Sequence, residues 1–248
     1  MTNFTIVNGQ IYTPGLAIVN APQPYTPLGG DTLHISLDVS GNGQLSLTPD
    51  DDEPTRFHNI TLFLTSSTTE KNFTISNGTE PLVFALPLTS EDSSSNSNSN
   101  GSVIPYTGPI LSLEPGSTVK HINWIWPECF VGDGDSGDQG ARGDYNISMH
   151  QAFRWNGTDY YTVFDLPISV SNGIDESEER VDCELLENEY SQALSEESSQ
   201  ELPGQPFVGE GVETSEIDGE DGGNTASGFG ISKLLRWAVA GLVVGAAL

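Results

Sequence analysis

Apolar and polar side chains alternate in short runs through residues 1–172, and this pattern restricts the chain to folds built from β-strands. Every second position is apolar in four runs: Leu33/Ile35/Leu37/Val39, Ile60/Leu62/Leu64, Ile122/Trp124/Trp126 and Tyr145/Ile147/Met149. Because successive side chains of a strand point to opposite faces, each run places its apolar set on one face. Clusters of Gly, Pro, Asn and Asp separate the runs, and sustained helical periodicity is absent. An all-β domain is therefore predicted.

One connection is specific enough to predict its turn. Asn156-Gly157 separates two strand runs and suits the two positive-φ positions of a type I′ turn, which pairs residues 144–153 with residues 160–170. About seven strands with closely spaced turns predict an antiparallel, immunoglobulin-like β-sandwich. Within it, the Ser/Asn-rich stretch of residues 90–102 is predicted to be a loop, because its composition offers nothing to bury.

Charge is distributed unevenly along the chain. The 248 residues contain 35 Asp and Glu against 8 Lys and Arg, a formal net charge of −27. Between residues 173 and 222 there are 17 acidic residues and one base, Arg180. So acidic a chain lacks the clustered cations that bind phosphates, which argues against a nucleic-acid partner. Residues 173–224 are predicted to form a self-repelling, disordered acidic stalk.

Seven Asn-x-Ser/Thr sequons are present, at Asn3, Asn59, Asn72, Asn77, Asn100, Asn146 and Asn156. Three of them, Asn59, Asn72 and Asn146, fall on the polar face of a predicted strand. A single sequon arises readily by chance in a chain rich in Ser, Thr and Asn. Seven sequons, three of them on outward faces, predict a secreted glycoprotein.

The two cysteines, Cys129 and Cys183, suit a secreted protein with a single disulfide. Closing a loop of about 55 residues would contribute on the order of 4 kcal/mol in the chain-entropy model. Two unpaired thiols are the alternative. A catalytic cysteine is disfavoured, because the sequence places no base beside either cysteine to hold it as a thiolate.

The last residues, 225–248, form a hydrophobic tail. Its apolar run from Trp237 to Leu248 has 12 residues, whereas a membrane-spanning helix needs about 20. The small residues of 222–227 are followed by a short spacer and then by the apolar run. This is the layout of a GPI-attachment signal with Asn224 as the attachment residue. A short tail anchor and a soluble or buried end remain alternatives. Because the first residues lack a basic and apolar leader, the signal peptide is expected to lie upstream of Met1.

Three stretches resemble a known group of proteins. Residues 27–36 are a Pro/Gly turn that enters an alternating strand, and residues 116–127 are a Trp-containing strand that ends in Pro. The third stretch, residues 143–148 with 160–164, is the closing hairpin. They are similar to fungal (ascomycete) GPI-anchored cell-surface proteins with an N-terminal immunoglobulin-like module, a group that includes cell-wall and β-glucan-assembly proteins. Residues 4–172 resemble conserved secreted proteins of filamentous ascomycetes. The resemblance implies display on the extracellular face of the plasma membrane or cell wall, with cell-wall polysaccharide as a partner.

The aromatic and histidine side chains are the candidate ligand-binding groups of the sequence. Trp124 and Trp126 share the core face with Ile122, which leaves Trp155, beside the hairpin turn, as the aromatic expected to stack on a glycan. The histidines alternate with apolar residues along strands and are expected to face solvent; they are His34, His58, His121 and His150. Neither a metal nor another cofactor is therefore predicted.

The chain is thus predicted to be a non-catalytic cell-surface or cell-wall-associated glycoprotein, bound to the membrane through a lipid anchor. Two alternatives stay open. An extracellular carbohydrate-active enzyme would require converging carboxylates in a concave site. An adhesin for a host or partner protein would require an exposed apolar or aromatic patch.

Overall fold

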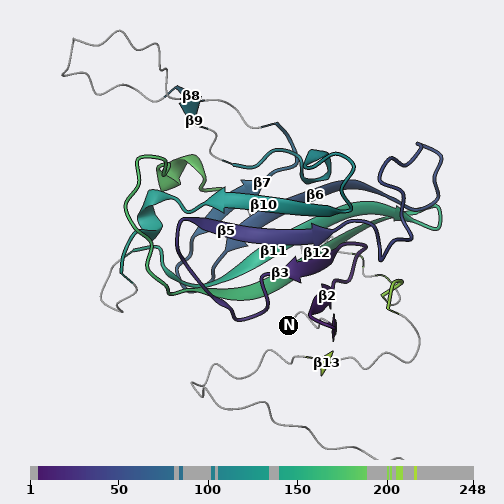
Figure 1. Cartoon of the computed structure of the whole chain (residues 1–248), viewed down its shortest axis with the longest axis horizontal. Coiled ribbons are helices and arrows are strands. Elements are labelled where there is room, and N and C mark those ends of the chain that lie inside the picture. Colours follow the sequence, from purple (N-terminus) through teal and green to yellow (C-terminus); the bar gives the residue numbers. More distant parts are fainter. Residues whose placement is uncertain are drawn as a thin grey trace, which may run out of the picture. The chain divides into compact units, whose positions relative to one another are not determined.

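A computed structural model describes residues 5–80, 84–85, 102–103, 106–133, 140–188, 200, 202, 205–208 and 215–216. The described part is all-β, with three short 3-10 helices (Figure 1). The first sheet has the strand order β10 (Val119–Ile125), β5 (Thr32–Asp38), β3 (Ile18–Ala21), β2 (Gln10–Tyr12), β1 (Thr5–Val7), β13 (Ser215–Glu216). The second has the order β4 (Pro27–Leu28), β12 (Thr158–Val170), β11 (Gly143–Trp155), β6 (Arg56–Thr65), β7 (Asn72–Ser76). A third sheet pairs β8 (Phe84–Ala85) with β9 (Ser102–Val103).

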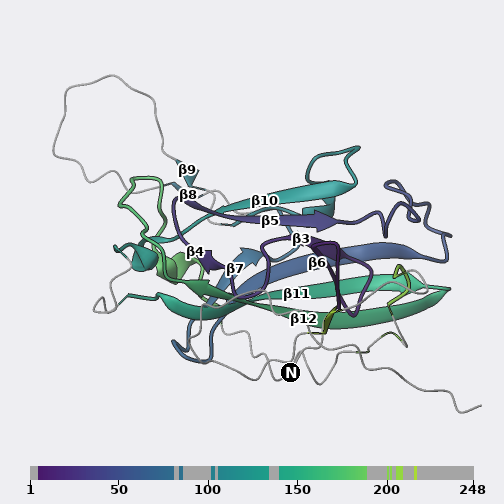
Figure 2. The same ribbon diagram turned by 60° about the horizontal axis from the view of Figure 1, so that its bottom comes forward.

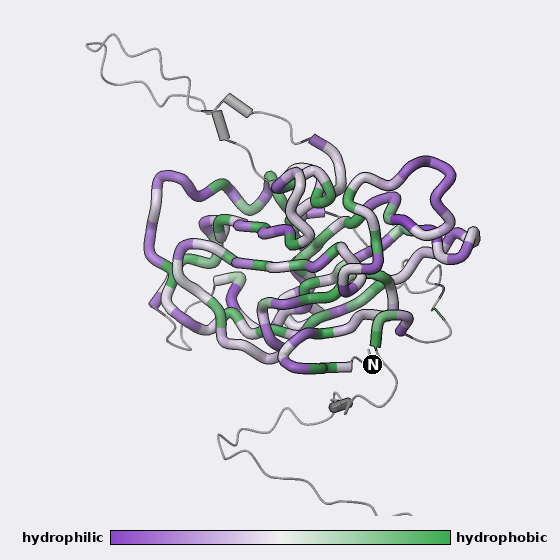
Figure 3. Tube along the Cα trace, turned by 45° about the vertical axis from the view of Figure 1, so that its right-hand side comes forward, coloured by the Kyte–Doolittle hydropathy of each residue, from purple (hydrophilic) through white to green (hydrophobic). Residues whose placement is uncertain are grey.

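The two large sheets form two layers that share one hydrophobic core. Figure 2 shows β10 and β5 in one layer and β6, β11 and β12 in the other. The predicted alternation is realised along the strands, where hydrophobic and hydrophilic residues follow one another (Figure 3). Leu37 and Ile122 of the first sheet meet Leu62, Ile147 and Leu166 of the second in one buried cluster. A void of only about 10 Å³ remains at the centre of this interface.

The predicted hairpin is present. Strands β11 and β12 pair along their full length, from Gly143 opposite Val170 to Trp155 opposite Thr158. Asn156 and Gly157 form the turn with φ values of 49° and 82°. Both angles are positive, as a type I′ turn requires, and Asn and Gly tolerate them best among the amino acids.

Residues 173–188, assigned to a stalk by composition, pack against the sheets instead; we call this segment the strap. Its apolar residues Ile174, Val181 and Leu186 are buried, whereas all of its acidic side chains are exposed. Ile174 pairs with Gly132 across an isolated bridge. The backbone oxygen of Leu186 accepts a hydrogen bond from Thr74 of β7 at 2.9 Å. The repulsion expected from composition is avoided because every carboxylate points to water.

Arg180, the single base of the acidic segment, fixes the middle of the strap. Its side chain is 1% exposed. The guanidinium donates to the backbone oxygens of Asp175 at 2.7 Å, Trp126 at 3.0 Å and Asp31 at 3.3 Å, and to the Asp31 carboxylate at 3.3 Å. Hydrogen bonds to a charged donor are stronger than neutral ones, so this set offsets the cost of burying the charge.

The predicted disulfide between Cys129 and Cys183 is present. Its Cα atoms lie 6.0 Å apart, and it joins the 3-10 helix Glu128–Phe130 after β10 to the 3-10 helix Cys183–Leu185 of the strap. The backbone nitrogen of Glu128 also donates to the oxygen of Val181 at 3.0 Å. The disulfide therefore holds the strap at the point where its chain already pairs with the domain.

A second contact draws a later part of the acidic region onto the domain. Phe207 is 3% exposed, and its ring meets Trp155 edge-on at 5.9 Å. Nearby, Gln205 donates to the backbone oxygens of Thr13 and Gly15 at 2.9 and 3.1 Å. Burial of Phe207 removes a large apolar surface from water, which stabilises this attachment.

Several predictions fall outside the described residues. They are the sequons at Asn3 and Asn100, the attachment residue Asn224, the tail of residues 225–248 and most of the loop of residues 90–102. Within the part of the chain that is described, no helix has both the length and the apolar character needed to cross a membrane.

Replacing Arg180 with Ala should lower the free energy of unfolding by about 3 kcal/mol, because three backbone oxygens, that of Trp126 at a buried contact, lose their charged donor. Urea denaturation at pH 7 measures the change. Arg154→Ala removes a solvent-exposed guanidinium paired with Asp159, so this control should lower the free energy of unfolding far less than Arg180→Ala. Equal losses in the two variants would show that Arg180 does not fix the strap.

Candidate functional site

A concave site lies at the free edge of β10, where the first sheet ends. It is a cavity of about 410 Å³, a size suited to a small ligand or a single side chain with its neighbours. We call it the edge pocket and define it by six of its lining residues: Glu80, Tyr106, Asn123, Trp124, Ile125 and Glu179. The chain thus forms the site from four separate segments, namely Glu80 after β7, the residues around Tyr106, the end of β10 and the strap.

Trp124 lines the edge pocket, but its side chain packs in the core, edge-on against Trp126 at 5.6 Å. The residue is 2% exposed, and among the described residues its indole nitrogen has no acceptor. The neighbouring Trp126 differs, because its indole nitrogen donates to the backbone oxygen of Gly29 at 3.4 Å. A buried donor without an acceptor costs about 1–3 kcal/mol, so the unpaired indole of Trp124 is a local cost to the stability of the core.

Backbone groups of β10 also face the edge pocket. Trp126 donates to Asp31, and Val39 donates to Thr118, so the even-numbered positions of this segment bond towards β5. Because neighbouring residues of a strand point their backbone groups in opposite directions, Asn123 and Ile125 direct theirs away from the sheet. In the described part of the chain, no backbone hydrogen bond reaches these two residues from outside the sheet.

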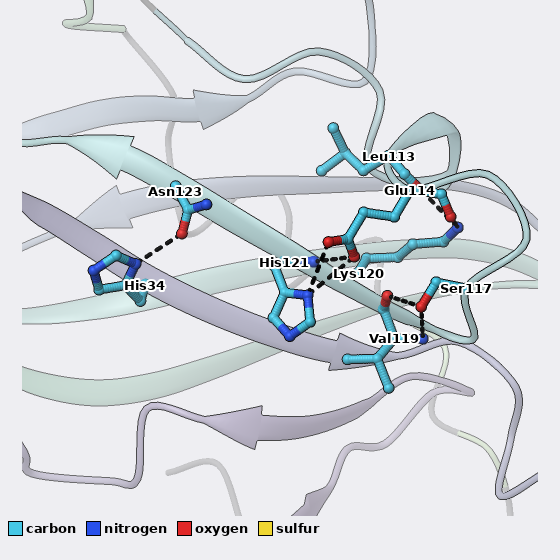
Figure 4. A network of polar contacts seen from close by, with 8 residues as sticks. All are labelled: His34, Leu113, Glu114, Ser117, Val119, Lys120, His121 and Asn123. Atoms are coloured by element: carbon cyan, nitrogen blue, oxygen red, sulfur yellow. Dashed lines mark hydrogen bonds and ion pairs between the residues drawn. The ribbon is translucent and has the colours of Figure 1, made fainter.

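The first half of the same edge is capped by side chains (Figure 4). Ser117 accepts from the backbone nitrogen of Val119 at 3.2 Å and donates to its oxygen at 2.7 Å. Glu114 accepts from the backbone nitrogen of His121 at 3.2 Å and contacts its ring at 3.0 Å. The hydrogen bond from His121 is the main reason that the pKa of Glu114 lies below its usual value. Such caps protect an edge strand from pairing with another chain.

Lys120 holds the capping loop in place. Lys120 is 4% exposed, and its ammonium donates to the backbone oxygens of Leu113 at 2.7 Å and Glu114 at 3.2 Å (Figure 4). Burial lowers the pKa of Lys120 from its ordinary value, since the charged form loses water. The cap ends at His121, so β10 is closed in its first half and open at Asn123 and Ile125.

The edge pocket is acidic. Glu80 and Glu179 are both exposed at its rim, and none of its described lining residues is basic. Ile125 adds an apolar side chain that is 41% exposed. This site was not predicted from the sequence. Ile125 is the one signal for it, because it is a large apolar residue at a position where strand alternation calls for a polar one.

The predicted glycosylation residues are placed differently from one another. Asn77 and Asn156 are exposed, whereas Asn59, Asn72 and Asn146 are half-buried. The side-chain oxygen of Asn77 accepts from the backbone nitrogen and the hydroxyl of Thr79, at 3.0 and 2.8 Å, within its own sequon. Exposure and a turn make Asn77 and Asn156 the most accessible of the described sequons.

Trp155 is not a free aromatic platform. It is half-buried and packs edge-on against Phe207, a contact that the composition of the acidic region did not suggest. Trp124 and Trp126 lie in the core, as predicted, with exposed fractions of 2% and 0%.

Three histidines face solvent as predicted, and one does not. His34 contacts Asn123 at 2.7 Å, His121 contacts Glu114, and His58 contacts Asp159 at 3.0 Å. His150 is 2% exposed, because the outer face of the second sheet is covered at this point. The described residues contain no group of three or more His, Cys, Asp or Glu side chains placed to hold a metal ion.

His150 belongs to a buried polar cluster. Its ring nitrogens contact the hydroxyls of Tyr161 at 2.5 Å and Ser148 at 3.2 Å, and Phe63 lies edge-on at 5.3 Å. Burial lowers the pKa of His150 to about 4. The prediction of an outward side chain was correct for its face but wrong for its exposure.

Acid should therefore destabilise the domain through His150. Between pH 6.5 and about 4 the unfolded chain binds a proton that the folded chain does not, so stability falls as the pH falls through this window. The loss should approach about 3 kcal/mol at pH 4. Urea denaturation at pH 7 and pH 4 should show a smaller loss in His150→Gln than in the native protein. His34→Gln, an exposed control, should leave the loss unchanged, and an equal loss in all three proteins would contradict this assignment.

Comparisons of the chain with protein-family models, with curated proteins and with solved structures found no match. What the edge pocket can bind follows from its own groups. It offers two exposed carboxylates, an exposed apolar side chain and two strand residues whose backbone groups face away from the sheet.

Proposed function

We propose that the protein is a non-catalytic, glycosylated surface module, secreted and held on the outer face of the plasma membrane or cell wall by a GPI anchor. The disulfide between Cys129 and Cys183 carries this proposal, since disulfides persist in the secretory pathway and are rare in the cytosol. The exposed sequon residues Asn77 and Asn156 support it, because glycans require accessible asparagines. Asn224 remains the proposed attachment residue.

We further propose that the domain is immunoglobulin-like. The order β3-β5-β10 in one sheet and β7-β6-β11-β12 in the other matches the strand order A-B-E and C′-C-F-G of such domains. The hydroxyl of Tyr145, near the start of β11, donates to the backbone oxygen of Ala141, as in a tyrosine corner. Burial raises the pKa of Tyr145 to about 12, which keeps this donor protonated. The disulfide departs from the inter-sheet bridge of antibody domains.

A binding role fits the edge pocket better than a catalytic one. Its carboxylates, Glu80 and Glu179, are exposed to water at the rim, whereas the paired carboxylates of glycoside hydrolysis need rigid placement roughly 5–10 Å apart. An extracellular carbohydrate-active enzyme remains the alternative, and it would require these two residues for turnover. Cell-wall polysaccharide is proposed, by resemblance, as a partner of the module as a whole and not of the edge pocket.

Glycan occupancy tests the secretory part of the proposal. When the full chain is expressed with a supplied signal peptide in a eukaryotic host, Asn77→Gln and Asn156→Gln should each remove one glycan. Intact mass before and after peptide-N-glycosidase treatment measures the loss. Ser76→Ala, which alters a neighbouring residue outside the sequon, should leave the mass of the glycans unchanged. Secretion of a protein without any glycan would contradict the proposal.

Anchor cleavage tests the membrane part. Phosphatidylinositol-specific phospholipase should release the protein from the cell surface, and Asn224→Trp, which places a bulky residue at the attachment site, should abolish the anchored form. Flow cytometry before and after treatment measures release. Detection of Leu248 in the mature surface protein by mass spectrometry would show that the tail is retained and that no GPI anchor replaces it.

A further inference from the structure

We propose that the open half of β10 and the edge pocket together bind an extended, basic peptide segment of a partner protein. The peptide would add a strand to the first sheet and place a Lys or Arg side chain in the pocket. This inference goes beyond the proposed function and does not depend on the anchor, since all the groups involved lie in the described domain.

The backbone geometry of β10 suits strand addition. Asn123 and Ile125 are two residues apart, and both direct their N–H and C=O groups away from β5. An extended peptide presents its own donors and acceptors with this same period, so one partner strand can satisfy both residues. The capping residues Ser117 and Glu114 block Val119 and His121, which restricts pairing to the far half of the strand.

The edge pocket supplies the side-chain contacts. It opens beside the open half of β10, since Asn123 and Ile125 both belong to its lining. Glu80 and Glu179 face the same cavity without a described basic neighbour in its lining. A Lys or Arg side chain would neutralise them, while Ile125 packs against its aliphatic part.

Charge decides between the possible occupants. A second copy of the chain would bring another −27 to an acidic site, which disfavours self-association through this edge. A neutral oligosaccharide would leave the two carboxylates uncompensated and does not match the spacing of strand backbone groups. A basic peptide satisfies the carboxylates and the strand edge together.

A peptide display library tests the inference. The full-length protein is used to select from a library of random dodecapeptides at low ionic strength. Enriched sequences should contain Lys or Arg and alternate between basic and apolar residues. The best of them, made synthetically, should lose most of its affinity when alternate backbone nitrogens are methylated, because methylation removes the donors that pair with β10.

Hydrogen exchange locates the peptide. In the free protein, the amides of Asn123 and Ile125 should exchange rapidly, and the peptide should slow both. The amide of Trp124, which bonds towards β5, should exchange slowly in either state and serves as the internal control. Slow exchange of Ile125 in the free protein would show that another part of this chain already covers the edge, which would overturn the proposal.

Matched variants test each contact. Ile125→Pro removes the edge N–H at a position where edge strands tolerate proline, and it should weaken binding about tenfold, whereas Ile125→Val should have little effect. Glu80→Gln with Glu179→Gln should weaken binding roughly threefold to tenfold and reduce its salt dependence. Glu178→Gln alters an exposed strap residue outside the pocket lining and should change neither quantity.

Three results would overturn the inference. The library could yield no enriched peptide, the methylated peptide could bind as tightly as the parent, or Glu178→Gln could match the pocket variants. Saturable binding of a neutral β-glucan oligosaccharide that is lost in Ile125→Pro and unaffected by salt would assign the pocket to saccharides instead. Methylation of the peptide leaves the protein unchanged, so that arm stays decisive even if Ile125→Pro fails to fold.

Discussion

The buried guanidinium of Arg180 is the interaction on which the candidate site depends. It ties the strap to the first sheet at two points. These are the backbone oxygen of Trp126, just after β10, and that of Asp31, just before β5. With the middle of the strap fixed, Glu179 and Val181 form one wall of the edge pocket. The disulfide at Cys183 adds a covalent restraint two residues beyond that wall.

The strap also shows how a strongly acidic segment can be ordered. Its carboxylates all face water, where repulsion between them is screened, while three apolar residues and one base face the protein. At its end the strap pairs with β7, so it also covers an edge of the second sheet. The strap therefore covers the edge of the second sheet at β7 and forms one wall of the edge pocket beside β10 of the first sheet.

The contrast between the two halves of β10 has a physical origin. An open strand edge invites pairing with other chains, and the protein closes one half with Ser117, Glu114 and the buried Lys120. The other half leaves the backbone groups of Asn123 and Ile125 without a described backbone partner outside the sheet, and a partner strand can pair with them there. The negative charge of the whole chain limits the hazard, because it repels further copies of the same protein.

The sequence by itself determined the all-β class, the β11–β12 hairpin with its Asn156-Gly157 turn, and the burial of Trp124 and Trp126, because alternation and turn chemistry are local properties. The even cysteine count also predicted the pairing of Cys129 with Cys183. Only the tertiary structure decided that residues 173–188 pack on the sheets, that Phe207 covers Trp155 and that His150 is buried. Composition averages over a segment, whereas burial depends on which few side chains meet a complementary surface. The edge pocket joins residues about 100 positions apart, so no local pattern could reveal it.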